Sequence, residues 1–416
     1  MSNLRVLIVG ASIAGPTAAY WLGKAGANVT VIERFPQLRM NGQNIDIRTV
    51  GVSVMRKIPG MEAAVRSKLV PMDGASIVGR NGRPYGTLWS TGNPDQQSMI
   101  SEFEILRGDL GKILHDKSNE YENVKYVFGE QVVSIHTDSE DGPITVKFMN
   151  GYPTTEYDLI VACDGAMSRT RAICFGCNVR DHIRPTNAWA VYYSVQQDFL
   201  NGSTVGEAYS APGGRMIAIG PDSPGVNRLT LMNNGVESTR RFRAAKASGT
   251  DTLKEFVASH YKGMGWRCEE AMQGMLEAKD FYGSEIVQVK MPSLSKGRFV
   301  LVGDAGYAGG PTGNGTSLAM AGAYILAGEI AKCEGDVAVG LKAYEEQMRP
   351  LIAELTKIPP LVLTVIAPQT VCGVWLRNWI FAFIYWSRIL DLVQRFFGAS
   401  FSNSEQYKVP EYEWAE

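Results

Sequence analysis

The chain has few histidines and cysteines, and its charges nearly cancel. Of its 416 residues 4 are histidine and 6 are cysteine, and 41 basic residues stand against 42 acidic ones. This balance gives no electrostatic footprint for nucleic acid, so we expect no nucleic-acid partner. Only Cys174 and Cys177 have C-x-x-C spacing, which makes a poor zinc site without a second pair or clustered histidines. We therefore expect no metal, and cysteines that are buried thiols in a reducing compartment.

The aromatic C-terminal region lacks an apolar run long enough to span a bilayer. The uninterrupted run between Asn378 and Ser387 is too short, and Arg377 and Arg388 flank it. Four large aromatic residues there fall near helical spacing: Trp375, Trp379, Phe383 and Trp386. We expect a packed helical cap; membrane contact through these helices is the less favoured alternative. The first predicted strand begins almost at Met1, so we expect no signal peptide and a cytoplasmic location.

What the sequence does contain is a strand–turn–helix–strand unit in its first 34 residues. The apolar run 6–9 ends at Gly10 and predicts a buried parallel strand, and the glycine turn to Gly15 opens a helical pattern. Backbone amides at such a helix start bind a pyrophosphate. Ser12 replaces the middle glycine of the usual motif, and Glu33 follows Gly15 by 18 residues, near the spacing for a ribose-binding acid. We interpret the unit as dinucleotide-binding in preference to an ordinary α/β turn.

Two further predicted strands end in polar turns. The strand near 157–162 leads to Asp164 and Gly165, and Ser168 is placed to cap the next helix. The strand near 299–302 leads to Gly303 and a glycine-rich turn before a helix at roughly 316–332. Alone, the Asp164 turn is more often structural, but ligands bind α/β sheets at the carboxyl ends of strands. Three polar strand ends together therefore indicate a ligand site.

The segments between these blocks suggest additional elements. Residues 50–70 and 251–275 look helical, 75–100 look like a hairpin, and the alternation within 186–233 predicts an antiparallel sheet with an aromatic face. Asp46 and Arg48 would share one face, which is either a solvated edge or a polar surface beside a cofactor. Arg107 lies near a helix start, where the helix dipole does not favour it. Arg107 either binds a nearby phosphate or is an ordinary surface arginine.

The three blocks together resemble the single-component FAD-dependent aromatic hydroxylases, or group A flavoprotein monooxygenases, including the tetracycline-inactivating branch. The match covers most of residues 4–330 and includes Asp164 through Arg171 and Gly303 through Gly315. It implies an α/β fold: a Rossmann-like FAD-binding domain of the glutathione-reductase type, an inserted antiparallel substrate domain and a C-terminal helical region. The implied boundaries are 1–75, 101–180 and 293–348 for the FAD-binding domain, 76–100 and 181–292 for the substrate domain, and 349–416 for the helical cap.

The resemblance also implies roles for individual residues. Glu33 would hold the adenosine ribose, Arg107 the FAD phosphates and Asp304 the ribityl chain. The turn from Pro311 would lie by the isoalloxazine, with Arg48 on its active-site side. The implied FAD-binding residues are Gly10, Ser12, Ile13, Ala14, Gly15, Glu33, Arg34, Arg107, Asp164, Gly303, Asp304, Pro311, Gly313 and Gly315. The implied catalytic residues are Arg48, Tyr307 and Pro311. Tyr307 stands where many members have histidine, and Ser317 where many have asparagine.

The implied activity is that of a monooxygenase that uses NADPH or NADH and O2. It would insert one oxygen atom into an aromatic or polycyclic small molecule through a flavin C4a-hydroperoxide, with secondary metabolism as the expected setting. Hydroxylation, epoxidation and Baeyer–Villiger insertion all stay open. So do two alternatives: a flavin oxidase or dehydrogenase without oxygen insertion, and an FAD-bound, membrane-associated interaction protein.

The implied substrate site lies against the sheet of residues 186–233. Half of the side chains on each strand must face away from it. The candidates are Trp189, Tyr192, Tyr193, Tyr209, Arg215 and Met232, of which Tyr192 and Arg215 are selected as substrate-binding residues.

Overall fold

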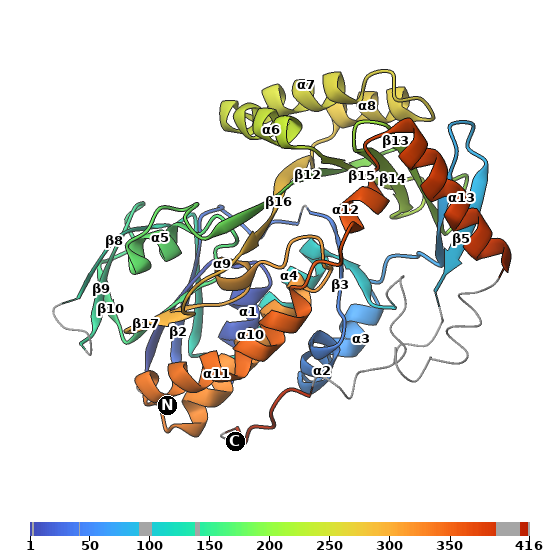
Figure 1. Cartoon of the computed structure of the whole chain (residues 1–416). Helices are drawn as coiled ribbons and strands as arrows, with labels where there is room; N and C mark the ends of the chain where they lie inside the picture. The colour runs from blue at the N-terminus through green and yellow to red at the C-terminus, as the bar shows by residue number, and fades with distance from the viewer. Residues whose placement is uncertain (2–3, 41, 91–101, 138–141, 388–407, 415–416) are drawn as a thin grey trace.

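A six-stranded sheet with buried, apolar strands forms the first part of the fold (Figure 1). The computed structural model describes residues 1, 4–40, 42–90, 102–137, 142–387 and 408–414. The strands lie in the order β17-β18-β11-β1-β2-β7, and all neighbours are parallel except β17 and β18. Their bounds are β1 Arg5–Val9, β2 Asn28–Glu33, β7 Val124–Phe128, β11 Leu159–Ala162, β17 Ser295–Lys296 and β18 Phe299–Leu301.

Protein covers both faces of this sheet, which explains why β1, β11 and β18 are apolar with little alternation. One face packs against helices, which include α1 Ala14–Lys24, α4 Arg107–Ser118, α10 Gly315–Lys332 and α11 Val337–Leu355. The other face packs against a three-stranded antiparallel sheet of β8 Val132–Thr137, β9 Ile144–Phe148 and β10 Thr155–Tyr157. The carboxyl ends of β1, β11 and β18 lie side by side because these strands are neighbours.

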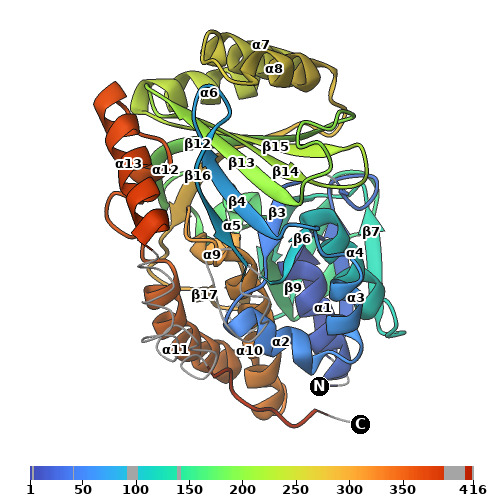
Figure 2. The ribbon, with the colours of Figure 1, turned by 90° about the vertical axis from the view of Figure 1, so that its right-hand side faces the viewer.

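A seven-stranded sheet in the order β16-β12-β15-β14-β13-β4-β5 forms the second part. Its strands are β4 Gly74–Val78, β5 Pro84–Trp89, β12 Ile183–Val195, β13 Val205–Ala211, β14 Arg215–Pro221, β15 Asn227–Asn234 and β16 Tyr282–Val289. Helices α6 Val236–Ser248, α7 Thr250–Tyr261 and α8 Cys268–Glu277 cover one face. Figures 1 and 2 show this sheet between those helices and the part built on the six-stranded sheet.

Short elements connect the two parts. Strands β3 Asn44–Asp46 and β6 Glu104–Leu106 form an antiparallel pair. The remaining helices are α2 Val50–Lys57, α3 Met61–Arg66, α5 Arg169–Phe175, α9 Asp304–Tyr307, α12 Val362–Ile366 and α13 Val371–Ser387. The described segment 408–414 returns to the first part, where the rings of Trp414 and Trp21 are 4.7 Å apart.

The structure confirms the predicted fold class. Residues 50–70 and 251–275 each form two helices, and β4 and β5 form the hairpin predicted within 75–100. That hairpin joins the seven-stranded sheet through a parallel pairing of β4 with β13. The domain boundaries stay a prediction. The end of the hairpin segment, residues 91–100, lies outside the described residues.

The expectation that the C-terminal aromatic residues pack as a cap was wrong for the four that fall near helical spacing. Trp375, Trp379, Phe383 and Trp386 are between 54% and 79% exposed. Helix α13 instead rests on β5 through another side, where a Cβ placed on Gly86 would lie 2.7 Å from Tyr385. These four residues do lie on a helix, as their spacing predicted, but on the face of α13 that points to solvent. Across the part of the chain that the structure describes, no helix has both the length and the apolar character to cross a membrane.

Candidate functional site

The glycine turn between β1 and α1 can be built only with glycine at both ends. Gly10 has a φ of +106°, and a Cβ placed on it would lie 2.6 Å from the Cys163 carbonyl oxygen. A Cβ on Gly15 would lie 1.9 Å from the Gly10 oxygen. Ile13 occupies the N-cap position of α1, and no described side chain caps this helix. Its first backbone amides are therefore suited to an anionic ligand.

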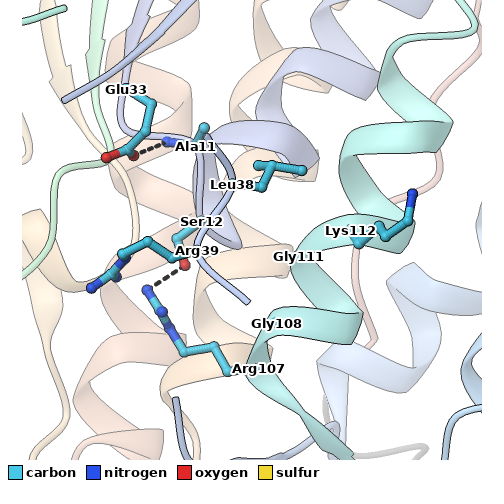
Figure 3. A pocket seen from close by; sticks show the side chains of 9 residues that line it. All are labelled: Ala11, Ser12, Glu33, Leu38, Arg39, Arg107, Gly108, Gly111 and Lys112. Carbon is cyan, nitrogen blue, oxygen red and sulfur yellow. Dashed lines mark hydrogen bonds between the residues drawn. The ribbon is translucent and has the colours of Figure 1, made fainter. Parts of the chain in front are cut away.

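Glu33 lies at the end of β2, directly beside this turn (Figure 3). Its carboxylate accepts a hydrogen bond of 2.9 Å from the Ala11 backbone N–H and one of 3.1 Å from that of Phe35. These two contacts fix the orientation of the acid. A carboxylate held in this way has lone pairs left for ribose hydroxyls.

Arg107 approaches the same turn from the start of α4. Its Nη2 donates a hydrogen bond of 2.6 Å to the Ser12 hydroxyl (Figure 3). The residue that replaces the usual glycine therefore binds the arginine side chain. Arg39 and Lys112 line the same pocket. Burial lowers the pKa of Arg107, and the nearby charge of Arg39 lowers it further. The cationic groups of Arg107, Arg39 and Lys112 around one pocket are suited to binding an anion.

Asp164 contributes to the site through packing and capping. Its carboxylate accepts from the Ser168 hydroxyl and from the Thr170 N–H and hydroxyl, at 3.1 and 3.0 Å for the latter two. Ser168 caps α5 through the Arg171 N–H, as predicted. The buried Arg171 guanidinium donates to the Ala305 carbonyl at 2.7 Å. This bond ties the second block of the sequence to the third.

The third block lies directly against the first. Gly303 has a φ of +68°, and a Cβ placed on it would be 3.0 Å from that of Ala14. A Cβ on Gly315 would be 3.6 Å from the Asp304 carboxylate, so this acid lies at the start of α10. Protein surrounds Asp304 on many sides even though its side chain is accessible to solvent. The loss of bulk solvent raises the pKa of Asp304, and the charge of Arg107 opposes this shift.

Sequence reasoning missed Gln288, which holds the turn from Gly309 to Gly315. The side-chain amide of Gln288 donates to the Gly309 carbonyl at 3.2 Å and to the Thr356 carbonyl at 2.7 Å. The Val289 N–H donates to the Ala308 carbonyl at 3.0 Å. The sequence signal that could have revealed it is the amide side chain of Gln288 within the otherwise apolar end of the strand that runs to Val289. These bonds fix the backbone beside Pro311.

Arg48 and Asp46 belong to a half-buried polar cluster beside α10. The Arg48 N–H donates to the Ser317 hydroxyl at 2.9 Å, and its guanidinium pairs with Asp46 at 2.9 Å. Glu104, which sequence reasoning missed, lies opposite Asp46 in the β3–β6 pair. Burial and then the Asp46 charge raise the pKa of Glu104 to about 7, although Asn44 and Arg48 lower it. The half-buried Asp46 and Arg48 do not form a fully solvated edge, and the place of their face beside a cofactor stays a prediction.

Several buried oxygen atoms occur in the same segment without a hydrogen-bond partner. Among the described residues none reaches the side-chain oxygens of Gln43, Asn44 and Thr49. Buried acceptors are normally paired, so their concentration beside Arg48 and Arg107 is unusual. A ligand with several hydroxyl donors would satisfy them.

Known monooxygenases match nearly the whole length of this chain. The family model described as "FAD binding domain" matches residues 3–358. The FAD-dependent monooxygenase asL4 of Sarocladium schorii is 31% identical over 408 aligned positions, and the match covers 92% of this chain and 93% of asL4. Monooxygenase CTB7 of Cercospora beticola is 31% identical over 423 aligned positions, and the match covers 99% of this chain and 98% of CTB7. This chain belongs to the FAD-dependent monooxygenases.

The crystal structure of the tetracycline destructase Tet(51) has the same fold as this monooxygenase. The TM-score is 0.77 at 26% identity, and the match covers 99% of this chain and 100% of Tet(51). Both comparisons agree with the group A aromatic hydroxylase type. The cofactor is FAD, and the substrates of such monooxygenases are O2 and a small molecule.

The residues of the site fit FAD. The uncapped start of α1, together with Arg107 and Arg39, offers amides and cations for a pyrophosphate. Glu33 offers a fixed acceptor at one end of this path. Asp304 offers another acceptor at the opposite end, next to the start of α10. These groups lie beyond the carboxyl ends of β2, β1 and β18 of one sheet, where α/β folds bind dinucleotides.

Three predicted site residues of this monooxygenase do not join the others. Arg34 is exposed, and its guanidinium lies over the Phe35 ring. Tyr307 is 2% exposed, and its hydroxyl points into the core toward Tyr344 at 3.3 Å. Arg215 lies on the face of the seven-stranded sheet that α7 covers, and it donates to the Pro212 carbonyl at 3.0 Å. Their positions correct the expectation of cofactor, catalytic and substrate contact, respectively.

The two faces of the seven-stranded sheet separate the substrate candidates. Trp189, Tyr193 and Tyr209 pack in the core under α6, α7 and α8. Tyr192 and Met232 alternate with these positions and lie on the opposite face. The rings of Tyr192 and Tyr282 are 6.5 Å apart. Arg39 lies over the Tyr282 ring at 5.6 Å, which connects this face to the cationic pocket.

Proposed function

We propose that this monooxygenase uses NAD(P)H to reduce its FAD and inserts one atom of O2 into an aromatic or polycyclic small molecule. One observation carries the proposal: the cofactor groups meet the open face of the seven-stranded sheet, because Arg39, which lines the pocket with Glu33, lies over the Tyr282 ring beside Tyr192. Glu33 meets Ala11, Arg107 meets Ser12, and Gly303 meets Ala14. The similarity to a tetracycline destructase supports a polycyclic substrate.

The residues of this chain have distinct tasks in that reaction. Glu33, Arg107 and Asp304 would hold the ribose, the phosphates and the ribityl chain. The turn at Pro311, fixed by Gln288, would support the isoalloxazine. FAD, when bound, supplies the transfer of reducing equivalents and the activation of O2. Closed packing of sheet and cofactor would exclude water from the reacting atoms.

Tyr192 is the substrate-contact residue that we propose. It is half-buried, lies on the face opposite the helices, and belongs to the same face as Met232. Burial raises the pKa of Tyr192 to about 12, so its hydroxyl stays protonated at neutral pH. The side chain can then donate a hydrogen bond to a substrate oxygen and offer its ring for stacking.

The test of the activity is a screen with isotope-labelled O2. Purified protein is incubated with NADPH or NADH and candidate polycyclic phenols, and the products are analysed by mass spectrometry. A product that carries one labelled oxygen atom supports the proposal. NAD(P)H oxidation that yields only hydrogen peroxide with every candidate would favour a flavin oxidase.

The test of Tyr192 uses its sequence neighbour as the control. Tyr192→Ala should raise the KM for the substrate, because it removes a ring and a donor from the open face. Tyr193→Phe should leave KM unchanged, since the Tyr193 hydroxyl is buried on the other face and donates to Ala271 at 2.9 Å. A KM that responds to Tyr193 and not to Tyr192 would reject this assignment of faces.

A further inference from the structure

Arg228 on β15 is an unusually well-fixed cation of the seven-stranded sheet. Its guanidinium pairs with Asp222 at 2.9 Å and with Asp280 at 3.3 Å. Only 11% of the Arg228 side chain is exposed. Asp280 in turn accepts from the Ser194 N–H at 3.0 Å. Two carboxylates hold the guanidinium in one orientation, which is costly to change when the groups are buried.

One N–H of Arg228 reaches beyond the sheet. Nη1 donates to the Gly42 carbonyl at 3.0 Å. Gly42 belongs to the segment between β2 and β3, which is part of the cofactor side of the fold. The contact therefore joins the seven-stranded sheet to the cofactor site across 186 positions of the chain.

The segment around Gly42 is packed against Arg107. A Cβ placed on Gly42 would lie 3.2 Å from both Cβ and Cδ of Arg107. The Arg107 N–H also donates to the Gln43 carbonyl at 3.1 Å. The Arg107 side chain is thus confined between this segment and Ser12, to which it donates at 2.6 Å.

We propose that Arg228 is a positioning residue for FAD, which acts from the seven-stranded sheet by holding the Gly42 segment against Arg107. The inference rests on the proposed place of Arg107 beside the FAD phosphates. Arg228 does not contact FAD in this proposal. It acts through its hydrogen bond to the Gly42 carbonyl and through the packing of Gly42 against Arg107. Ser194 and Arg228 are paired in register, two residues along β12 from Tyr192. The same sheet face therefore carries the substrate contact and the support of the cofactor site.

The main variant is Arg228→Lys in the full chain. Lysine keeps a positive charge near Asp222 and Asp280, but its single ammonium cannot also serve Gly42 in the geometry of a guanidinium. We expect the Kd for FAD, measured by flavin fluorescence with the FAD-free protein, to rise about tenfold, the factor that 1.4 kcal/mol gives.

Arg180→Lys is the matched control for this variant. Arg180 also pairs with a carboxylate of the seven-stranded sheet, that of Glu285 at 2.9 Å. Its hydrogen bonds within the described ranges go to Glu285 and Met167, and none goes to the Gly42 segment. The control should therefore leave the Kd for FAD unchanged.

A double-mutant cycle with Arg107→Gln separates positioning from general destabilisation. If Arg228 acts through Arg107, then Arg228→Lys should change the Kd less than twofold in the Arg107→Gln background. Additive losses, or an unchanged Kd in Arg228→Lys, would overturn the inference. An unchanged Kd in Arg107→Gln alone would instead reject the proposed place of Arg107.

Gly42→Ala keeps the inference testable if Arg228→Lys does not fold. The added methyl group would press on Arg107 and leave the Arg228 ion pairs intact. We expect weaker FAD binding, with the protein still folded by circular dichroism. An unchanged Kd in folded Gly42→Ala would overturn the inference, because the segment would then not set the position of Arg107.

Discussion

Gly303 and Ala14 lie so close that a Cβ added to Gly303 would be 3.0 Å from the Cβ of Ala14. The two residues are 289 positions apart, and each follows the carboxyl end of a strand of one parallel sheet. Such a distance is shorter than ordinary van der Waals contact between carbon atoms. The close approach is what brings the first and third blocks of the site together.

Gly303→Ala should therefore destabilise the protein and weaken FAD binding. The backbone of Gly303, with φ +68° and ψ −145°, is unfavourable for an L-residue, and the new methyl group would overpack a core at a cost of about 1–3 kcal/mol. Gly176→Ala is the control, because Gly176 has φ +67° but no atom within 4 Å of the point that its Cβ would occupy. Thermal unfolding measures the loss of stability in each of the two variants. Equal losses of stability would show that the approach to Ala14 does not matter.

Glu104→Gln should flatten the dependence of stability on pH. The folded-state pKa of Glu104 is raised to about 7 from 4.5, so the folded protein binds the proton more tightly than the unfolded chain does. The free energy of unfolding then falls as pH rises from about 4.5 to about 7, by up to roughly 3 kcal/mol. Urea unfolding at several pH values measures this change in the free energy of unfolding. The decrease with rising pH should be smaller in the variant than in wild type, because position 104 does not titrate in the variant.

Glu130→Gln serves as a control of opposite sign for this pH prediction. Burial raises the pKa of Glu130, but four backbone N–H donors lower it overall. Its contribution to stability is present above the unfolded pKa and is lost as pH falls. A Glu104 variant that behaved like the Glu130 variant would contradict the assigned shift.

Asp304→Asn should bind FAD about 10- to 150-fold more weakly. A charge-assisted hydrogen bond contributes on the order of 1.5–3 kcal/mol, and asparagine keeps the size of the side chain while it removes the charge. Fluorescence titration of the FAD-free protein measures the Kd. Asp336→Asn, at the exposed N-cap of α11, is the control and should leave the Kd unchanged. Unaltered affinity in folded Asp304→Asn would reject the ribityl role.

Tyr307→Phe should cost stability and leave the flavin chemistry intact. The Tyr307 hydroxyl lies in the core 3.3 Å from that of Tyr344, which donates to the Leu301 carbonyl at 2.8 Å. Losing one such bond costs about 1 kcal/mol. Urea unfolding and stopped-flow reduction of the flavin by NADPH measure the two effects. A slowed reduction without a loss of stability would restore Tyr307 as a catalytic candidate.

Trp379→Gln and Trp386→Gln should leave the free energy of unfolding within about 0.5 kcal/mol of wild type, because both rings are mainly exposed. They should also reduce self-association in sedimentation velocity, since they shrink an apolar surface. Phe381→Ala is the packed control: a Cβ on Gly86 would lie 3.2 Å from the Phe381 ring, and we expect a loss of stability there. A large loss in both tryptophan variants would show that their rings are packed after all.

The sequence was sufficient for the fold and for the strand ends of the site because both follow local rules. Apolar strands that end in glycine and an acid predicted the neighbourhood of Gly10, Asp164 and Gly303. The same rules do not reveal which way a side chain points once tertiary packing decides it. Arg215 and Tyr192 both lie in alternating strands, and only the position of α6, α7 and α8 shows which of them faces the helices.

The residues that sequence reasoning missed act through contacts between distant segments. Gln288 holds a turn that follows it by 21 residues, and Arg228 reaches a carbonyl 186 positions away. Neither belongs to a motif with fixed spacing. Glu104 belongs to no motif either, and its environment depends on β3, which brings Asp46 opposite it. Periodicity places residues on faces, but it does not say which faces meet.

The strand order of the six-stranded sheet also has a consequence for how the protein folds. Its central strand β1 pairs with β2 close by, but with β11 only after residue 159, and β11 pairs with β18 only after residue 299. During synthesis, apolar β1 must wait for β11, which leaves the ribosome much later, while β13, β14 and β15 can pair as consecutive hairpins and β12 then pairs with β15. The seven-stranded sheet should thus gain protection from hydrogen exchange before the six-stranded one in refolding. The cofactor site, built on strand ends from three distant segments, is among the last parts to form.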